Sequence, residues 1–186
     1  RSSSAASDVY KRQILYISNG LIPKRNDKYK WTGILPGNTS ETLWTEYYKT
    51  SELPQVINPE SGYIYNANHS PFKSTSLDEN PNPKDFATNM GFETFDNNRS
   101  TRIFELVESY DAIDYEAFKT IKYDNKFPTP FNYNFMNINN IMEMSPENYP
   151  EISDILEQIQ KWDRITDANS TGAGAYAMFY LSLIHI

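Results

Sequence analysis

Few residues in this chain have side chains suited to catalysis, and most of them stand alone. The sequence contains two histidines and no cysteine. Without cysteine there is no disulfide, no thiolate metal site and no cysteine nucleophile. Neither His69 nor His185 has a second histidine at ligand spacing, so a zinc site is not expected. The sequence patterns of a nucleophile elbow, a P-loop and a dinucleotide-binding turn are missing as well.

Residues 62–71 have the sequence GYIYNANHSP, in which a run typical of a β-strand is followed directly by Asn66 and Asn68. The amide of Asn68 can donate a hydrogen bond to a developing oxyanion without bringing a net charge, and such donors contribute about 10²–10³ in rate. A loop rooted in a strand is a suitable place for such a donor. Alternatively, Asn66 and Asn68 hydrogen-bond within their own turn, as asparagine often does. The residues alone favour this second interpretation.

Carboxylates and aromatic rings provide two further candidate sites. Asp78 and Glu79 could supply oxygen ligands to a hard cation such as calcium, although an isolated acidic pair is usually a solvated turn. Among the 14 tyrosines and 3 tryptophans, a sugar or acyl pocket could be lined by Trp31, Trp44, Tyr47, Tyr48, Tyr63 and Tyr65, but core packing is the more common role of such residues. On a strand, Tyr63 and Tyr65 would share one face. An aromatic-rich glycan-binding module is therefore a second function class that the composition allows.

Size and charge exclude several classes of protein. The 186 residues are 39% hydrophobic, enough for the core of one domain or of a piece of a larger one. The formal net charge is -7, and no basic stretch is longer than Lys24-Arg25, so nucleic acid is not an expected partner. No apolar run approaches the roughly 20 residues that span a bilayer, so a membrane is not an expected partner either.

Both ends of the chain differ in composition from the rest. Residues 1–13, RSSSAASDVYKRQ, are rich in serine and alanine and lack the apolar stretch of a secretory signal, and residues 181–186 are LSLIHI. Both resemble translated sequencing-adapter text. We therefore expect these ends to be non-native, with residues 14–180 as the native fragment and a reading frame that continues in both directions.

The elements of the first half are predicted to be short strands and turns. Residues 14–18 form a β-type run that ends at the Asn-Gly pair 19–20, which predicts a tight hairpin back into residues 21–23. Residues 53–57 are a further extended segment, closed by a turn at 58–62.

The second half is predicted to be helical. The proline-punctuated loop 78–83 (DENPNP) separates it from the strands. Apolar spacing predicts a helix over 100–110, Asp114 is a suitable N-cap for a second, and Pro150 opens a third, whereas 126–148 has no clear assignment. One face of the third helix carries Ile152, Ile155, Leu156, Ile159 and Trp162. A strand-rich half followed by a helical half predicts an α+β fold.

Residues 53–71, LPQVINPESGYIYNANHSP, together with the preceding segment from residue 31, resemble the penicillin acylase (penicillin amidase) family of N-terminal nucleophile hydrolases. Within the family, the resemblance is nearest to the acyl-homoserine-lactone and aculeacin-type acylases. Further matches follow in family order across 14–180. They are Ile22-Pro23 with Arg25, RSTRI at 99–103, Trp162-Asp163 and ANSTGA at 168–173.

The resemblance implies a hydrolase, part of a four-layer αββα core, whose precursor cuts itself to expose a serine at the start of its larger subunit. That serine attacks the acyl carbonyl with its own α-amino group as base, and the acyl-enzyme is then hydrolysed. The implied substrates are small N-acyl compounds such as penicillins, acyl-homoserine lactones or lipopeptides. The implied partner is the smaller subunit of the same precursor, and the implied location is periplasmic or secreted, with a role in antibiotic metabolism.

The resemblance also assigns roles by position in the family motifs. Asn68 is the oxyanion donor, and Arg99 supports the site, with Arg102 as the alternative register. Asp78 or Glu79 falls near a family calcium ligand, with Asp78 our choice, and no cofactor is needed for the chemistry.

Departures from the family pattern limit what this chain can do by itself. Glu46 stands where the family usually has glycine, and His69 stands where asparagine or aspartate is common and receives no catalytic role. The nucleophilic serine would lie upstream of Ile14, so we expect the fragment to be inactive alone. The alternatives are the glycan-binding module and a degenerate acylase that has lost its nucleophile.

Overall fold

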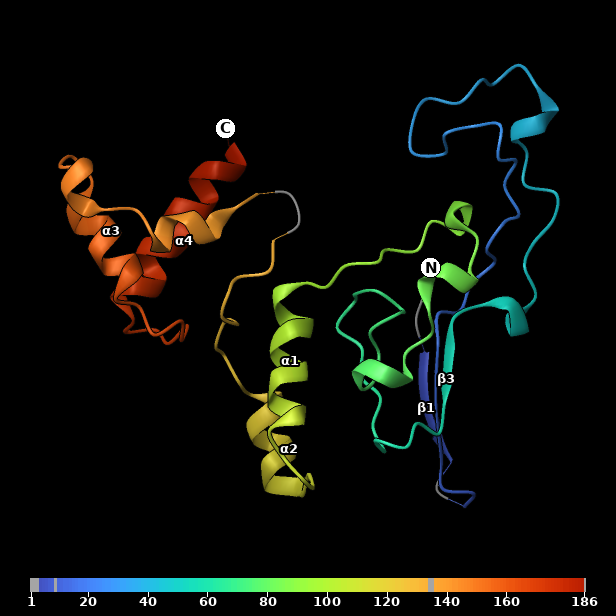
Figure 1. The fold of residues 1–186 in the computed structure, drawn as a ribbon, viewed down its shortest axis with the longest axis horizontal. Helices are drawn as coiled ribbons and strands as arrows, with labels where there is room; N and C mark the ends of the chain where they lie inside the picture. The colour runs from blue at the N-terminus through green and yellow to red at the C-terminus, as the bar shows by residue number, and fades with distance from the viewer. Residues whose placement is uncertain (1–3, 9, 134–135, 186) are drawn as a thin grey trace. The chain divides into compact units, whose positions relative to one another are not determined.

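The computed structural model describes residues 4–8, 10–133 and 136–185, which fall into two compact units. We call Arg1–Asp96 the N-terminal unit and Asn97–Ile186 the C-terminal unit. Among the described residues, all three strands belong to the first and all four α-helices to the second (Figure 1). The predicted mixed α+β class is therefore confirmed, although the N-terminal unit consists more of loops than of strands.

The sheet of the N-terminal unit has three antiparallel strands in the order β1 (Ser4–Asp8), β2 (Gln13–Ile17) and β3 (Gln55–Ile57). Its register is held at one end by Asn58, whose side chain accepts from the N–H of Ile14 at 2.9 Å while its own N–H donates to the Ile14 carbonyl at 3.0 Å. The two predicted extended segments are therefore strands.

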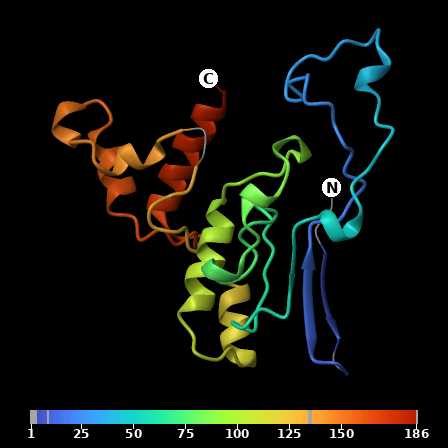
Figure 2. The same ribbon diagram turned by 45° about the vertical axis from the view of Figure 1, so that its right-hand side comes forward.

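The hairpin predicted at residues 19–20 is wrong. β2 pairs with β3, and residues 21–23 instead form an isolated bridge to Tyr47, across a loop that carries only short 3₁₀ turns between the two strands (Figure 2). The reason is burial, because Ile22 is packed against Leu53 and Met90 in a small core. That contact directs the segment toward residues far along the chain and away from its sequence neighbour.

The four helices of the C-terminal unit are α1 (Asn98–Glu108), α2 (Tyr115–Lys122), α3 (Ser153–Gln160) and α4 (Thr171–His185). The first two confirm the predicted helices and lie side by side (Figure 2). The Asp114 side chain caps α2 by accepting from the N–H of Ala117 at 2.8 Å, as predicted. Pro150 does not open α3, which begins three residues later with Ile152 as its N-cap residue.

The core of this unit is aromatic and lies between α3, α4 and the segment before α3. Its buried members are Phe131, Ile138, Ile141, Leu156, Ile159, Trp162 and Tyr176. Three of the five residues on the predicted face of α3 are thus buried, whereas Ile152 and Ile155 remain 38% and 45% exposed. Among the described residues, no helix is both long and apolar enough to cross a bilayer.

The start of α4, which the sequence did not predict, is fixed by close packing of Gly172 against the core. A Cβ at this glycine would lie 2.4 Å from the Cβ of Trp162, whereas one at Gly174 would meet nothing within 4 Å. The tryptophan itself donates its indole N–H to the carbonyl of Ile165 at 2.7 Å. The packing therefore gives a steric reason for glycine at position 172.

Candidate active-site loop

Asn68 lies in a loop, residues 66–73, between residues 62–65 and residues 74–76. The segment before it forms no strand, contrary to the prediction, and a backbone hydrogen bond from Tyr65 N–H to the Ser74 carbonyl at 2.9 Å links the two sides. The hydroxyl of Thr75 takes the place of a second ladder bond by donating to the Tyr63 carbonyl at 2.8 Å. Tyr63 and Tyr65 do lie together, with ring centroids 6.4 Å apart.

The two asparagines of this loop are used differently. Asn66 accepts the backbone N–H of Asn68 on its side-chain oxygen at 2.9 Å, which is the local turn that asparagine favours. Asn68 has a φ of 56°, in the left-handed region that asparagine tolerates better than most residues. Asn68 is exposed while Ala67 and His69 on either side are buried. The turn interpretation therefore applies to Asn66, and the side chain of Asn68 lies on an exposed part of the loop.

His69 bridges the loop from inside. Its Nδ1 accepts the N–H of Ala67 at 3.1 Å, and its Nε2 lies 2.5 Å from the carbonyl of Lys73. A ring that accepts at Nδ1 and faces a carbonyl at Nε2 is the neutral Nε2–H tautomer. The residue is 8% exposed, and its ring stacks on Tyr65 with 5.0 Å between centroids and 17° between planes.

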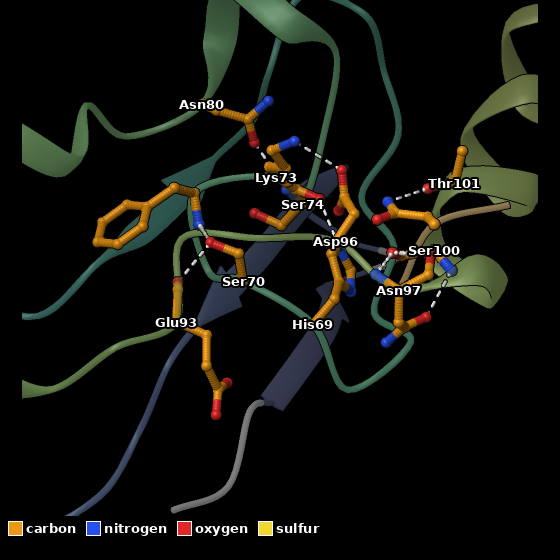
Figure 3. A network of polar contacts seen from close by, with 12 residues as sticks. His69, Ser70, Lys73, Ser74, Asn80, Glu93, Asp96, Asn97, Ser100 and Thr101 are labelled. Atoms are coloured by element: carbon orange, nitrogen blue, oxygen red, sulfur yellow. Dashed lines mark hydrogen bonds and ion pairs between the residues drawn. The ribbon is translucent and has the colours of Figure 1, made fainter. Parts of the chain in front are cut away.

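The far side of the loop is tied to residues 93–96, as Figure 3 shows. Ser70 is fully buried, donates to the Glu93 carbonyl at 2.7 Å and accepts the N–H of Phe72 at 3.2 Å. Lys73 forms an ion pair with Asp96 at 2.7 Å. These bonds connect the loop to the segment that directly precedes α1.

Asn80 holds the segment that follows the loop, a role that the sequence analysis missed. Its side-chain oxygen accepts the N–H groups of Ser74 and Thr75 at 2.7 and 3.1 Å. Its amide donates to the carbonyls of Thr75 and Ser76 at 3.0 and 2.7 Å. The only signal in the sequence was an asparagine inside a proline-punctuated loop, which does not say which backbone groups it will bind.

Arg99 and Arg102 on α1 have different surroundings. The helix starts with a capping box in which Asn97 accepts from the N–H of Ser100, and Ser100 accepts from the N–H of Asn97, each at 2.9 Å. Arg99 lies in the first turn and is exposed. Arg102 forms a bidentate pair with Asp124 at 2.8 and 2.9 Å, which lowers the pKa of the carboxyl and raises that of the guanidinium. Arg102 thus has a structural role, because its ion pair links α1 to Asp124 within the same unit.

Asn68 belongs to the N-terminal unit and Arg99 to the C-terminal unit, and each is described within its own unit. Their predicted roles rest on the sequence resemblance. What the structure adds is that Arg102, the alternative register, already has a structural ion pair.

The acidic pair of the proline-rich loop has the geometry of a turn. The carboxylate of Glu79 accepts the N–H groups of Glu60 and Ser61, and hydrogen bonding by the Ser61 hydroxyl is the main cause that lowers the pKa of Glu79. Asp78 is exposed, and the described part of the chain gathers no group of three or more acidic, histidine or cysteine side chains. These two carboxylates therefore do not fit a calcium site by themselves, and the assignment of Asp78 stays a prediction.

Most of the aromatic rings are used in packing. Trp31 and Trp44 each lie 5.8 Å from the guanidinium of Arg25, so an arginine of the chain already occupies that pair of rings. In the N-terminal unit, Phe72 and Phe86 line a small apolar groove of about 530 Å³. A larger apolar groove of about 1040 Å³ runs along α3 and α4 in the C-terminal unit.

Comparison with known protein families covers almost the whole chain. Residues 8–185 match the model of the penicillin amidase family. The match includes the Asn68 loop, the start of α1 and the Trp162–Gly172 contact. It confirms the resemblance seen in residues 53–71. This chain therefore belongs to the penicillin amidase family, a family of amide hydrolases.

Proposed function

We propose that this chain is an internal fragment of the nucleophile-bearing subunit of an acylase that cleaves the amide bond of small N-acyl compounds. Family membership supports the general chemistry. The observation that carries the proposal further is the exposed Asn68, held in a left-handed conformation between two buried residues. This is the arrangement expected of an amide that must meet a substrate while its backbone stays rigid.

The proposed reaction follows from the residues and from a serine supplied upstream. The serine oxygen attacks the acyl carbonyl, and the carbonyl oxygen takes up negative charge in the tetrahedral intermediate. Asn68 donates its amide N–H to that oxygen, which stabilises the negative charge although the amide itself carries no net charge. The intermediate collapses to an acyl-serine ester as the amine leaves with a proton, and water then releases the acid.

The finer parts of the proposal follow from the family resemblance. They are the αββα core, the smaller subunit of the same precursor as partner, the periplasmic or secreted location, and a substrate such as a penicillin, an acyl-homoserine lactone or a lipopeptide. We further propose that an apolar pocket selects the acyl chain, as is usual for such ligands. The groove lined by Phe72 and Phe86 lies in the same unit as Asn68 and is a candidate wall.

The decisive experiment substitutes Asn68 in the full-length reading frame. Asn68→Gly tolerates the left-handed backbone and removes the amide, whereas Asn68→Asp keeps the shape and replaces donor by acceptor. Both should lower kcat by about 10²-fold or more while self-cleavage and Tm stay unchanged. Asn38→Asp, the same change at an exposed asparagine outside the loop, should leave kcat unaltered.

Wild-type turnover in both Asn68 variants would remove this residue from the mechanism. Sequencing of the flanking reading frame provides an independent check. A serine suited to self-cleavage upstream supports the acylase, while a complete frame with that serine replaced would identify a degenerate member of the family.

A further inference from the structure

We infer that His69 is a positioning residue that holds the amide of Asn68 in place through the loop backbone. The inference rests on the proposed function, since it names a second residue for the same site. His69 does not touch the substrate in this proposal. It acts by fixing the conformation of its neighbour.

The two hydrogen bonds of the ring bind backbone groups that lie before and after Asn68 in the chain. One bond ends on the N–H of Ala67, the residue before Asn68, and the imidazole itself belongs to the residue after it. The second bond reaches across the loop to the carbonyl of Lys73. Because the chain is bridged on both sides of Asn68, its φ of 56° cannot relax without the loss of at least one of these bonds.

Burial makes the bridge rigid and keeps it away from the reaction. The His69 side chain is almost fully buried and stacks on Tyr65, and a half-turn of the ring would break both hydrogen bonds by putting ring carbons in place of the two nitrogens. Both ring nitrogens are already engaged with the backbone, which leaves neither as a base for the substrate. A buried group whose two polar atoms bind backbone on either side of an exposed amide is suited to preorganisation.

Misplacement of a catalytic group by about 1 Å can cost 10²-fold in rate. His69→Leu removes both hydrogen bonds at similar volume, and His69→Asn can retain an acceptor near Nδ1. In the full-length, self-cleaved enzyme we expect His69→Leu to lower kcat by about 10–10²-fold with little change in KM, and His69→Asn to recover much of the loss.

The test is a double-mutant cycle with Asn68→Gly. If His69 acts only through Asn68, then His69→Leu has no further effect on kcat once the amide is gone. Effects that multiply in the double mutant would overturn the inference. A wild-type kcat in Asn68→Gly alone would overturn the proposed function instead, so the two failures are distinguishable.

A control separates positioning from general loss of stability. Leu53→Ala truncates a buried residue of the same unit, outside the loop, and should lower Tm without lowering kcat per cleaved molecule. If His69→Leu does not fold, ¹⁵N NMR of the wild-type imidazole still decides. We expect an unprotonated Nδ1 and a protonated Nε2 at the pH of full activity, and a charged ring or the opposite tautomer would refute the proposed bridge.

Discussion

Replacement of Gly172 by alanine sets two physical effects against each other at the start of α4. Alanine is favoured over glycine within helices by up to about 1 kcal/mol, which predicts stabilisation. The structure predicts the reverse, because the new Cβ would lie 2.4, 2.7 and 2.9 Å from three side-chain atoms of Trp162. The closest approach is about 1 Å inside the 3.4 Å at which ordinary van der Waals contact begins.

Trp162 has little room to move away from such a group. Its own Cβ is the nearest atom, its indole is bonded to Ile165, and its ring lies 5.1 Å from that of Tyr176 in the buried cluster. Overpacking of this kind costs about 1–3 kcal/mol. Since at most about 1 kcal/mol of helix propensity offsets it, Gly172→Ala should lower the free energy of unfolding by up to about 2 kcal/mol.

The matched control is Gly174→Ala, two residues further along the same helix. Its Cβ would meet nothing within 4 Å, so only the propensity gain remains and the variant should be as stable as wild type or more so. Urea unfolding followed by far-UV circular dichroism reports on this helical unit. If Gly172→Ala proves as stable as Gly174→Ala, the close packing on Trp162 is refuted.

Three further predictions concern α1 and α2. The pairing with Arg102 lowers the pKa of Asp124 in the folded state, so it stabilises the fold fully above the unfolded pKa of about 4. This stabilisation is lost as the pH falls through the lower, folded pKa. The urea midpoints of wild type and Asp124→Asn should therefore converge in acid, and a constant gap would contradict this. Asp114→Ala should cost about 1 kcal/mol by leaving the N–H of Ala117 uncapped, measurable as a loss in the urea midpoint, whereas Asp114→Ser should restore most of it. Arg99→Ala in the full-length enzyme should impair activity or self-cleavage without the stability loss expected of Arg102→Ala, and a normally processed, fully active variant would refute the role of Arg99.

Local features of the fold were predictable because their hydrogen bonds close within a few residues. The cap at Asp114 and the apolar spacing of α1 depend only on neighbours three or four positions away. The Asn19-Gly20 hairpin failed for the opposite reason. Burial of Ile22 against Leu53 and Met90 outweighed a local turn preference.

In the candidate site, too, some features could be predicted from the sequence and others depend on contacts between distant residues. The motif of residues 53–71 indicated the family, and position in that motif made Asn68 the candidate oxyanion donor. It did not reveal which of the two asparagines makes the turn, that Asn80 holds the following segment or that Arg102 has an ion pair with Asp124. Each of these depends on which backbone or charged group lies nearby in space.

By itself, therefore, the sequence determined the family, the α+β class and the identity of the candidate amide, because these depend on residue type and order. Only the tertiary structure decided that Asn68 is exposed and that His69 is a buried bridge with both nitrogens engaged. The physical reason is that burial and hydrogen-bond partners are properties of the folded chain. A histidine beside an asparagine has no assigned role until the groups that surround its ring are known.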